Sequence, residues 1–358
     1  MSAQTTGQPA RRICHLNLAR NFRGGQRQTE LLIRALAERG VPQRALVAAD
    51  GALRARLDDV PDLELRPVGK PHWRHLRHTR GCLVHSNGGS ALTLAWLSWK
   101  LQGTPYIFTR RINKPIKGNP VSRAKYRGAR HIANVCRLAQ TTLLEALPGV
   151  PSSVVYSVTA GFSPDPARVA ALRAQWGERY VLVNVAALNA AQKGQPYLIE
   201  AARQLADSDP RLHFVLCGGG PDEAALRAQA EGLTNVEFHG HVENVGDYLA
   251  AADAFIFPSL SEGLGTTLLD AMKFDLPVIS TGCDGIPEIV RHEDNGLLVP
   301  TRDAQALASA AQRLAGDPAL AQRLAAAGAR FAADFVPARM AAQYLAIYDA
   351  VLADVDAG

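Results

Sequence analysis

Residues 252–299 read ADAFIFPSLSEGLGTTLLDAMKFDLPVISTGCDGIPEIVRHEDNGLLV, and this stretch predicts the fold of the chain. The apolar run 254–257 is typical of a strand, residues 259–266 have turn composition, and residues 267–273 are typical of a helix. A second apolar run, 277–281, follows and ends in a glycine turn that leads to a further helix start. This order predicts a β-α-β-α unit with a parallel sheet.

The loop of this stretch has the chemistry of an anion site. Gly263 and Gly265 flank Leu264, so the backbone can approach a ligand closely, and the loop ends at a helix N-terminus that favours anionic oxygens. Glu262 precedes the glycines, and Asp270 follows it eight positions later. Two carboxylates beside an anion site suit a ligand rich in hydroxyl groups, such as a sugar nucleotide. An ordinary Rossmann-like crossover with solvated acids is the alternative.

Residues 262–278, EGLGTTLLDAMKFDLPV, resemble the signature of family 4 glycosyltransferases. The resemblance implies that Glu262 contacts hydroxyl groups of the donor sugar and that Asp270 holds the nucleotide ribose. The family usually has Glu where Asp270 stands, so this contact would need a shorter reach or a water molecule. The resemblance also implies that the loop binds sugar and diphosphate through its backbone, at Gly263, Leu264, Gly265 and Thr266.

Length and composition favour two domains of ordinary size. The chain has 358 residues, of which 47% are hydrophobic and 20% charged, a globular composition. It has no apolar stretch of about eighteen residues and no apolar signal core at its N-terminus, so we expect a cytoplasmic protein. Its five cysteines are scattered without CxxC spacing, which predicts reduced thiols and neither a disulfide framework nor a metal site.

Charge is distributed unevenly along the chain. Residues 1–160 contain 25 Lys plus Arg and 8 Asp plus Glu, net +17, whereas residues 161–358 contain 14 and 25, net −11. A positive field of this size attracts phosphate-rich partners, which could be nucleic acid, an anionic membrane or a phosphorylated glycolipid. Solvated faces of an arginine-rich protein are the alternative. Residues 70–80, KPHWRHLRHTR, include Trp73 among cations, which is typical of a membrane-interface contact or of a solvated loop.

Several candidate residues follow predicted strands of the first half. A strand at 12–18 precedes NFRGGQRQ, where the resemblance implies that Gly24 and Gly25 close over donor phosphates or acceptor; a structural turn is the alternative. Another strand, 82–85, leads to SNGG. Related enzymes often have His-x-His here, and this chain has His85 and Asn87. We therefore include Asn87 among the candidate acceptor residues.

A strand at 105–109 precedes the basic segment 110–130, RRINKPIKGNPVSRAKYRGAR. In many family members a histidine lies here beside the donor sugar, and Arg111 takes that position. An arginine cannot act as a base, but Arg111, with Arg110 beside it, can clamp a phosphate or stabilise a leaving diphosphate. Nucleic-acid binding is the competing interpretation of this segment. Few aromatic residues are interleaved for stacking and no known module is present, so we expect no nucleic-acid partner.

The second half opens with YVLVNVAALNAAQKGQPYLIEAA, a strand, a loop and a helix. It resembles the family's Lys-Gly loop, which implies that Lys193 neutralises the donor diphosphate, the service that a metal supplies in other transferases. Ala187 stands where the family has an arginine, and Arg110 or Arg111 is our hypothesis for the missing charge.

The glycine run after residues 213–217 reads GGGP and lacks the full G-x-G-x-x-G fingerprint, which argues against a dehydrogenase. The resemblance places Gly218 in the turn beneath the nucleotide. By the same resemblance Val242, after the strand at 236–242, is the candidate contact for the base.

These patterns predict an α/β chain with two facing Rossmann-like domains, the GT-B architecture, and a cleft between them. We expect an acceptor domain at 1–160 and a nucleotide-sugar domain at 161–338. The resemblance implies that the last helix, 339–358, returns to the first domain.

The implied function is that of a retaining, hexosyltransferase-like enzyme of bacterial surface-glycan synthesis. No Asp-x-Asp pair ends a predicted strand, so we expect no metal and no cofactor. The donor would be a UDP-, GDP- or ADP-sugar. The basic first half favours as acceptor a lipopolysaccharide core or another lipid-linked glycan, with peripheral contact at the cytoplasmic face of the inner membrane. A transferase for a soluble acceptor and a non-catalytic sugar-nucleotide-binding subunit are the alternatives.

Overall fold

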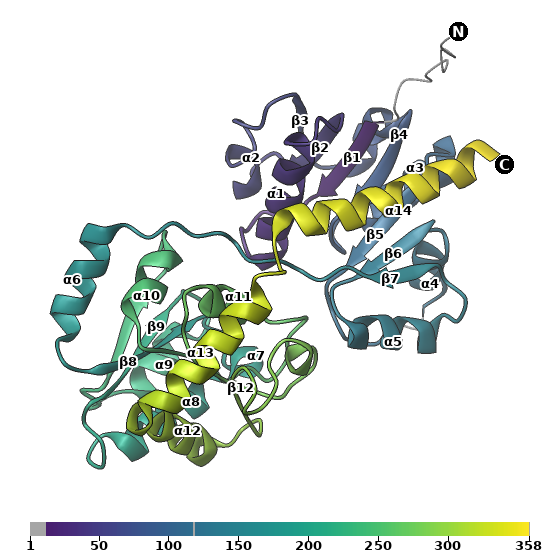
Figure 1. Cartoon of the computed structure of the whole chain (residues 1–358). Coiled ribbons are helices and arrows are strands. Elements are labelled where there is room, and N and C mark those ends of the chain that lie inside the picture. The colour runs from purple at the N-terminus through teal and green to yellow at the C-terminus, as the bar shows by residue number, and fades with distance from the viewer. Residues whose placement is uncertain (1–11, 117–118, 358) are drawn as a thin grey trace, which may run out of the picture. The chain divides into compact units, whose positions relative to one another are not determined.

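The computed structural model describes residues 12–116 and 119–357, which form two compact units. Unit 1 contains Met1–Val158 and Val336–Gly358, and unit 2 contains Thr159–Phe335. Each unit is built on one parallel sheet covered by helices (Figure 1).

The sheet of unit 1 has seven parallel strands in the order β3-β2-β1-β4-β5-β6-β7. Its central strands are buried almost throughout, which is the pattern of a parallel sheet with both faces covered. The strands are β1 (Arg12–Asn17), β2 (Gln43–Ala48), β3 (Leu63–Val68), β4 (Cys82–Ser86), β5 (Tyr106–Arg110), β6 (His131–Asn134) and β7 (Ser152–Val154).

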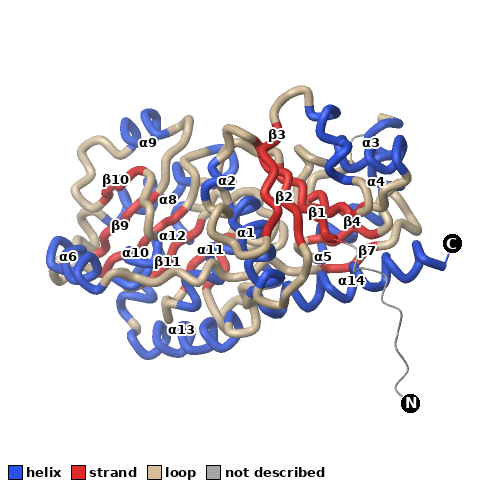
Figure 2. The backbone as a smooth tube through the Cα atoms, turned by 90° about the horizontal axis from the view of Figure 1, so that it is seen from above, coloured by secondary structure: helices blue, strands red, loops and turns tan. Residues whose placement is uncertain are grey.

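Helices cover both faces of this sheet, and the last helix of the chain is one of them. The helices are α1 (Gly24–Ala37), α2 (Ala52–Ala55), α3 (Leu92–Gln102), α4 (Pro120–Arg127), α5 (Arg137–Ala146) and α14 (Pro337–Ala357). Side chains of α1 and α14 share one core with Ile13, Leu83 and Ile107 of the strands. Side chains of α3, α4 and α5 share another core with Val84 and Phe108. Neighbouring strand residues point to opposite faces, so the two sets of helices cover opposite faces; Figure 2 shows the strands between α3 and α14.

The segment around Trp73, for which a solvated loop was one of two interpretations, forms a short 3₁₀ helix, η1 (His72–Thr79). The helix lies on α3, and Leu76 packs against the same core as Trp96 and Trp99. Only Trp73 and Leu76 are apolar among its eight residues, too few to establish a helical period, which is why the sequence pattern missed this element.

Buried polar side chains join α14 to the centre of the sheet. His85 bonds the hydroxyl oxygen of Tyr348 through Nδ1 and Oγ1 of Thr109 through Nε2, both at 2.7 Å. Thr109 Oγ1 also bonds the hydroxyl of Tyr344 at 2.7 Å. Burial, followed by the nearby charges of His15 and Arg111, holds the pKa of His85 well below its usual value. Burial likewise lowers the pKa of His15 to about 4.

These two histidines predict a loss of stability in mild acid. Both are neutral in the folded protein and gain a proton on unfolding below about pH 6.5, so the free energy of unfolding falls as pH drops below that value. His15 alone should account for about 2 kcal/mol between pH 7 and pH 5. Urea unfolding at the two pH values measures the difference. It should shrink in His15→Gln and stay unchanged in the control His241→Gln, an exposed position; equal differences in both variants would refute the prediction.

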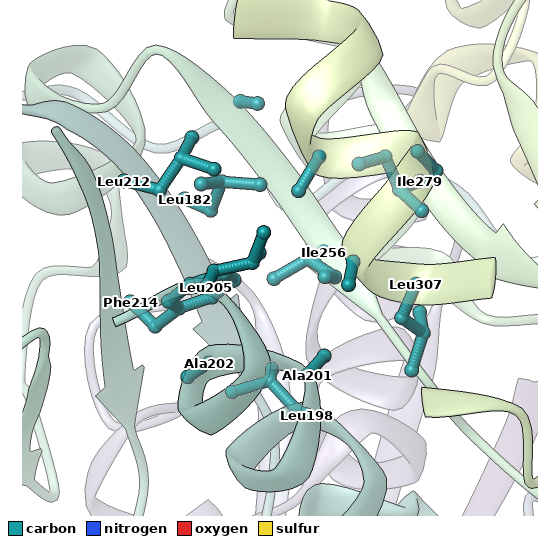
Figure 3. Close-up of a cluster of buried hydrophobic side chains, with 14 of the residues drawn as sticks. Leu182, Leu198, Ala201, Ala202, Leu205, Leu212, Phe214, Ile256, Ile279 and Leu307 are labelled. Carbon is teal, nitrogen blue, oxygen red and sulfur yellow. The ribbon is translucent and has the colours of Figure 1, made fainter. Parts of the chain in front are cut away.

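The sheet of unit 2 has six parallel strands in the order β10-β9-β8-β11-β12-β13. Its strands are β8 (Tyr180–Val185), β9 (Leu212–Cys217), β10 (Val236–Gly240), β11 (Ala254–Phe257), β12 (Val278–Thr281) and β13 (Leu297–Val299). Its helices are α6 (Pro166–Trp176), α7 (Ala190–Lys193), α8 (Gln195–Leu205), α9 (Glu223–Gln229), α10 (Val245–Ala251), α11 (Thr266–Lys273), α12 (Ala304–Gly316) and α13 (Pro318–Ala332). Leu182, Phe214 and Ile256 of the strands pack against Leu198 and Leu205 of α8 (Figure 3).

The stretch that predicted the fold forms β11, a loop, α11 and β12, as expected. The second predicted helix start, however, is only a single 3₁₀ turn, η2 (Ile286–Glu288). Its continuation is stopped by Asn295, whose side chain accepts from the Arg291 N–H at 2.7 Å and donates to the Ile289 carbonyl at 2.9 Å. Side-chain bonds of this kind compete with the backbone bonds of a helix.

Candidate functional site

Two loops of unit 2 bring a lysine and a glutamate together at the carboxyl ends of β8 and β11. The N–H groups of Leu260 and Ser261 donate to the Gln192 carbonyl at 2.8 and 3.2 Å, so the loop after β11 lies against α7. Lys193 thereby forms an ion pair with Glu262. The side chains are only 16% and 11% exposed, respectively. The structure therefore joins two of the three residues predicted to be catalytic.

Neighbouring side chains hold both charged groups of this ion pair in place. The Ser259 hydroxyl donates to Glu262 Oε1 at 3.0 Å, the same oxygen that contacts Lys193. Lys193 Nζ also lies 5.3 Å from the ring centroid of Phe257, within the range of a cation–π interaction. The pair lies at the end of the sheet, where α/β proteins bind ligands.

Asp284 belongs to the same site, and the sequence analysis missed it. Its Oδ2 accepts from the Glu262 N–H at 2.8 Å and from the Ser261 hydroxyl at 2.9 Å. Asp284 has a φ of 49°, in the left-handed region that Asp tolerates better than most residues. The signal that could have identified Asp284 in the sequence is its place inside the turn between two glycines, Gly282 and Gly285.

The glycine loop leads to the N-terminus of α11 as predicted. Gly265 has a φ of 85° and precedes Thr266, the first residue of the helix, and Leu264 is buried. Among the described residues, no acceptor bonds the backbone N–H groups of Leu264, Gly265 or Thr266. Gly263 is half-buried beside them. These N–H groups and the helix dipole provide the environment that anionic oxygens prefer.

Asp270, the predicted ribose ligand, is buried on α11. Its Oδ1 accepts from the Ala160 N–H at 2.6 Å, which ties the start of unit 2 to the helix. A ribose hydroxyl would have to use the acceptor positions that this contact leaves. The ribose contact therefore stays a prediction.

Gly218, after β9, is required by close backbone packing. A Cβ atom there would lie 1.9 Å from the carbonyl oxygen of Ala186, and the Gly218 N–H donates to the Gly240 carbonyl at 2.6 Å. Gly220 meets the Leu188 carbonyl oxygen in the same way, at 2.2 Å. Val242 lies half-buried beyond β10. The glycine run is thus explained by loop packing, whatever it binds.

In unit 1, Arg111 lies among three of the other predicted residues. Its Nε donates to the Asn87 carbonyl and its Nη1 to the Ser157 hydroxyl, both at 3.3 Å. A Cβ atom on Gly25 would lie 3.5 Å from Arg111 Cδ, and Gly24 precedes it as the first residue of α1. Burial lowers the pKa of Arg111, and the nearby Tyr344 opposes that effect.

Asn87 presents a polar atom that the fold does not satisfy. Its Nδ2 contacts the His85 carbonyl and His15 Nδ1, but its buried Oδ1 bonds no partner in the described part of the chain. A buried acceptor of this kind costs free energy unless a ligand or water pairs with it. Asn87 is therefore a candidate contact for a ligand hydroxyl group.

Arg110 differs from the prediction. Its side chain is fully buried, and its guanidinium donates to the carbonyl oxygens of Ala139 and Lys114. These bonds hold the segment after β5 against α5. Arg110 and Arg111 point to opposite faces because consecutive residues at a strand end do so. A role for Arg110 in binding phosphate would require these bonds to break.

The close approach of the two loops that join Lys193 to Glu262 predicts a strong effect of Gly194→Ala. Gly194 has a φ of 66°, and a Cβ atom there would lie 2.0 Å from the Pro258 carbonyl oxygen. The left-handed conformation alone costs an alanine about 1–2 kcal/mol. Urea unfolding should show a clearly larger loss for Gly194→Ala than for Gly40→Ala, which has a φ of 67° and open space. Equal losses would mean that the loop contact contributes nothing.

Comparison with known proteins identifies the class of fold. Residues 179–317 match the family model described as glycosyl transferases group 1. Over nearly the whole chain, the fold matches solved structures of the GT-B type, which confirms the two predicted parallel-sheet Rossmann-like domains. HepE of Anabaena, in complex with UDP and glucose, has a TM-score of 0.83 at 20% identity and is covered to 99% by 95% of this chain. Sucrose-phosphate synthase of Thermosynechococcus elongatus has a TM-score of 0.75 at 20% identity, with 96% and 100% covered.

Two sequence relatives of this chain are named as glycosyltransferases, and they match it over a shorter length. EpsD of Bacillus subtilis (strain 168), whose name gives glycosyltransferase as a provisional activity, is 32% identical over 58% of this chain and 57% of its own. The amylovoran biosynthesis glycosyltransferase AmsK of Erwinia amylovora is 33% identical over 50% of this chain and 46% of its own. The chain thus spans about half the length of the curated relatives that it matches.

Two properties of the described residues concern membranes and metals. None of their helices is both long and apolar enough to cross a bilayer. Nor do the same residues include a group of three or more His, Cys, Asp or Glu side chains placed to hold a metal ion.

Proposed function

We propose that this protein is a glycosyltransferase that moves a sugar from a nucleotide diphosphate to a hydroxyl group of a bacterial surface glycan. The proposal depends above all on the Lys193–Glu262 pair, which lies beside a glycine loop whose N–H groups precede α11. The family model covers this region of unit 2. A sugar needs hydroxyl acceptors and a diphosphate needs cations and N–H donors, and this site offers both.

The donor would be a UDP-, GDP- or ADP-sugar, and UDP-glucose is the first to test. HepE, whose fold this chain shares, has been crystallised in complex with UDP-glucose. In our proposal Lys193 and the N-terminus of α11 bind the diphosphate, and Glu262 positions the sugar. Asp270 would hold the ribose. Gly218 and Val242 would lie beside the nucleotide.

The proposed reaction retains the anomeric configuration and needs no metal. The acceptor oxygen forms a bond to the anomeric carbon while the bond from that carbon to the phosphate oxygen breaks. The acceptor's proton passes to the leaving phosphate, so no carboxylate nucleophile is needed. Lys193 would stabilise the charge that develops on the leaving diphosphate, which is the usual source of a large rate enhancement.

The proposed acceptor is a phosphorylated lipid-linked glycan, such as a lipopolysaccharide core, at the cytoplasmic face of the inner membrane. Unit 1 supports this choice with Arg111, Gly25 and the unsatisfied Asn87 Oδ1. A relative adds support, since AmsK is named as a glycosyltransferase of amylovoran biosynthesis.

Nucleotide binding tests the donor site directly. At a concentration a hundredfold above its Kd, the matching nucleotide diphosphate should stabilise the protein by about 2.7 kcal/mol. A thermal-shift comparison of UDP, GDP and ADP measures this effect. Lys193→Gln should abolish it, whereas Lys273→Gln, at an exposed position of α11, should not. A protein that no nucleotide diphosphate stabilises would contradict the proposal, and binding without transfer from any nucleotide sugar would indicate a non-catalytic subunit.

Arg111→Ala tests the role of unit 1. If its guanidinium stabilises a phosphate in the transition state, turnover should fall by about tenfold or more, which corresponds to at least about 1.4 kcal/mol. Arg111→Lys should restore part of the rate, because a lysine keeps the charge but loses the bidentate geometry. The control is Arg54→Ala, an exposed arginine of α2. Unchanged kcat and KM in Arg111→Ala would remove this role.

A further inference from the structure

A long part of unit 1 has no negative charge. Residues 65–144 contain 15 Lys plus Arg and no Asp or Glu. Arg66 pairs with Glu64 just outside the segment, but no acid within the segment offsets its positive charge. A field of this kind extends into solvent up to the Debye length. The excess of positive charge in the first half of the chain is thus concentrated in one continuous segment of 80 residues.

The same segment contains every large hydrophobic side chain that is exposed in the described residues. The most exposed are Leu101 at 69%, Trp73 at 59% and Val121 at 54%. The other exposed side chains are Ile112, Leu138 and Leu144. None lies in unit 2, all of which is described. Single exposed apolar residues are ordinary, but their restriction to the one segment without acids indicates a surface with a partner.

Except for Ile112, which lies in the loop after β5, these residues lie on helices that cover one face of the sheet. Helix α3 contacts both η1 and α4, and α3, α4 and α5 share the core that is opposite to α1 and α14. Figure 2 shows α3 and α4 together on the side of the strands away from α14. We call the exposed side of η1, α3 and α4 the basic face.

A pocket lies in the basic face between α3 and α4. It has a volume of about 410 Å³ and is lined by Trp99, Lys100, Pro120, Arg123, Ala124, Arg127 and Gly128. Lys100 Nζ lies 4.4 Å from the ring centroid of Trp99, and Gly128 leaves room for that ring, because a Cβ atom there would lie 2.9 Å from it. Arg123 donates to the Ala146 carbonyl through Nη2 at 2.9 Å, and no other side-chain bond of its guanidinium is found among the described residues. Exposed Leu101 follows Lys100 in sequence, and exposed Val121 is the second residue of α4, the helix that carries Arg123 and Arg127.

We infer that the basic face docks on an anionic phospholipid membrane, with a lipid phosphate in the pocket among Lys100, Arg123 and Arg127. Leu101 and Val121 then enter the boundary between head groups and acyl chains, where apolar burial adds to the electrostatic attraction. A nucleic acid would pair with the cations but would leave the exposed leucine and valine without an apolar partner. The inference deepens the proposed function by naming the surface that brings the enzyme to a lipid-linked acceptor.

Vesicle sedimentation tests the inference without any donor or glycolipid, so its outcome does not depend on the proposed activity. Wild-type protein should bind vesicles of phosphatidylglycerol and phosphatidylcholine at low salt, and pure phosphatidylcholine vesicles weakly. Lys100→Gln/Arg127→Gln should weaken binding to the anionic vesicles about tenfold or more, because each cation near the surface contributes about fivefold. Arg54→Gln/Arg330→Gln, two exposed arginines outside the basic face, should bind like the wild type.

A second double variant tests whether Leu101 and Val121 enter the membrane. Leu101→Gln/Val121→Gln leaves the charge unchanged and should remove the binding that persists at high salt. Circular dichroism and thermal unfolding verify that each variant is folded. The inference is overturned if the wild type does not prefer anionic vesicles, or if the Lys100/Arg127 pair and the Arg54/Arg330 pair bind alike. Binding to single-stranded DNA in the absence of vesicle binding would assign the charge to nucleic acid and also overturn it.

Discussion

The contact between the loops after β8 and β11 determines where the charges of unit 2 lie. Gly194 allows the Pro258 carbonyl to approach at a distance that no side chain permits, and the Gln192 carbonyl then accepts two N–H groups from the neighbouring loop. Lys193 and Glu262 are paired because of this backbone packing, since they are 69 residues apart in sequence. A positioned cation of this kind costs no reorganisation when charge develops on a ligand, which is the essence of electrostatic preorganisation.

Much of this arrangement could be predicted from the sequence, because strands buried on both faces read as apolar runs and glycine loops interrupt them. Residues 254–257 were predicted as the strand that the structure contains, and Lys193 and Glu262 were each placed at a strand end. Their direct pairing could not be predicted, because it depends on long-range packing. Asp284 was missed for the same reason: its carboxylate acts through the Glu262 N–H, a contact that no local pattern reveals.

Side-chain direction explains the difference between Arg110 and Arg111. The sequence shows two adjacent arginines at the end of a strand and cannot say which one turns inward. In the structure Arg110 bonds carbonyl oxygens inside unit 1, whereas Arg111 lies beside Gly25 and Asn87. A shift of one residue along a strand reverses the face, so errors of this kind are expected wherever two like residues end a strand.

Helix α14 has a consequence for the order in which the protein is made. Unit 1 is completed by residues that follow unit 2 in the chain, because Tyr344 and Tyr348 close the polar network around His85 and add to its core. All of unit 2 is synthesised before them. During translation, therefore, unit 2 can fold as a finished domain while unit 1 waits with an open core, a stage at which chaperone binding would protect it most.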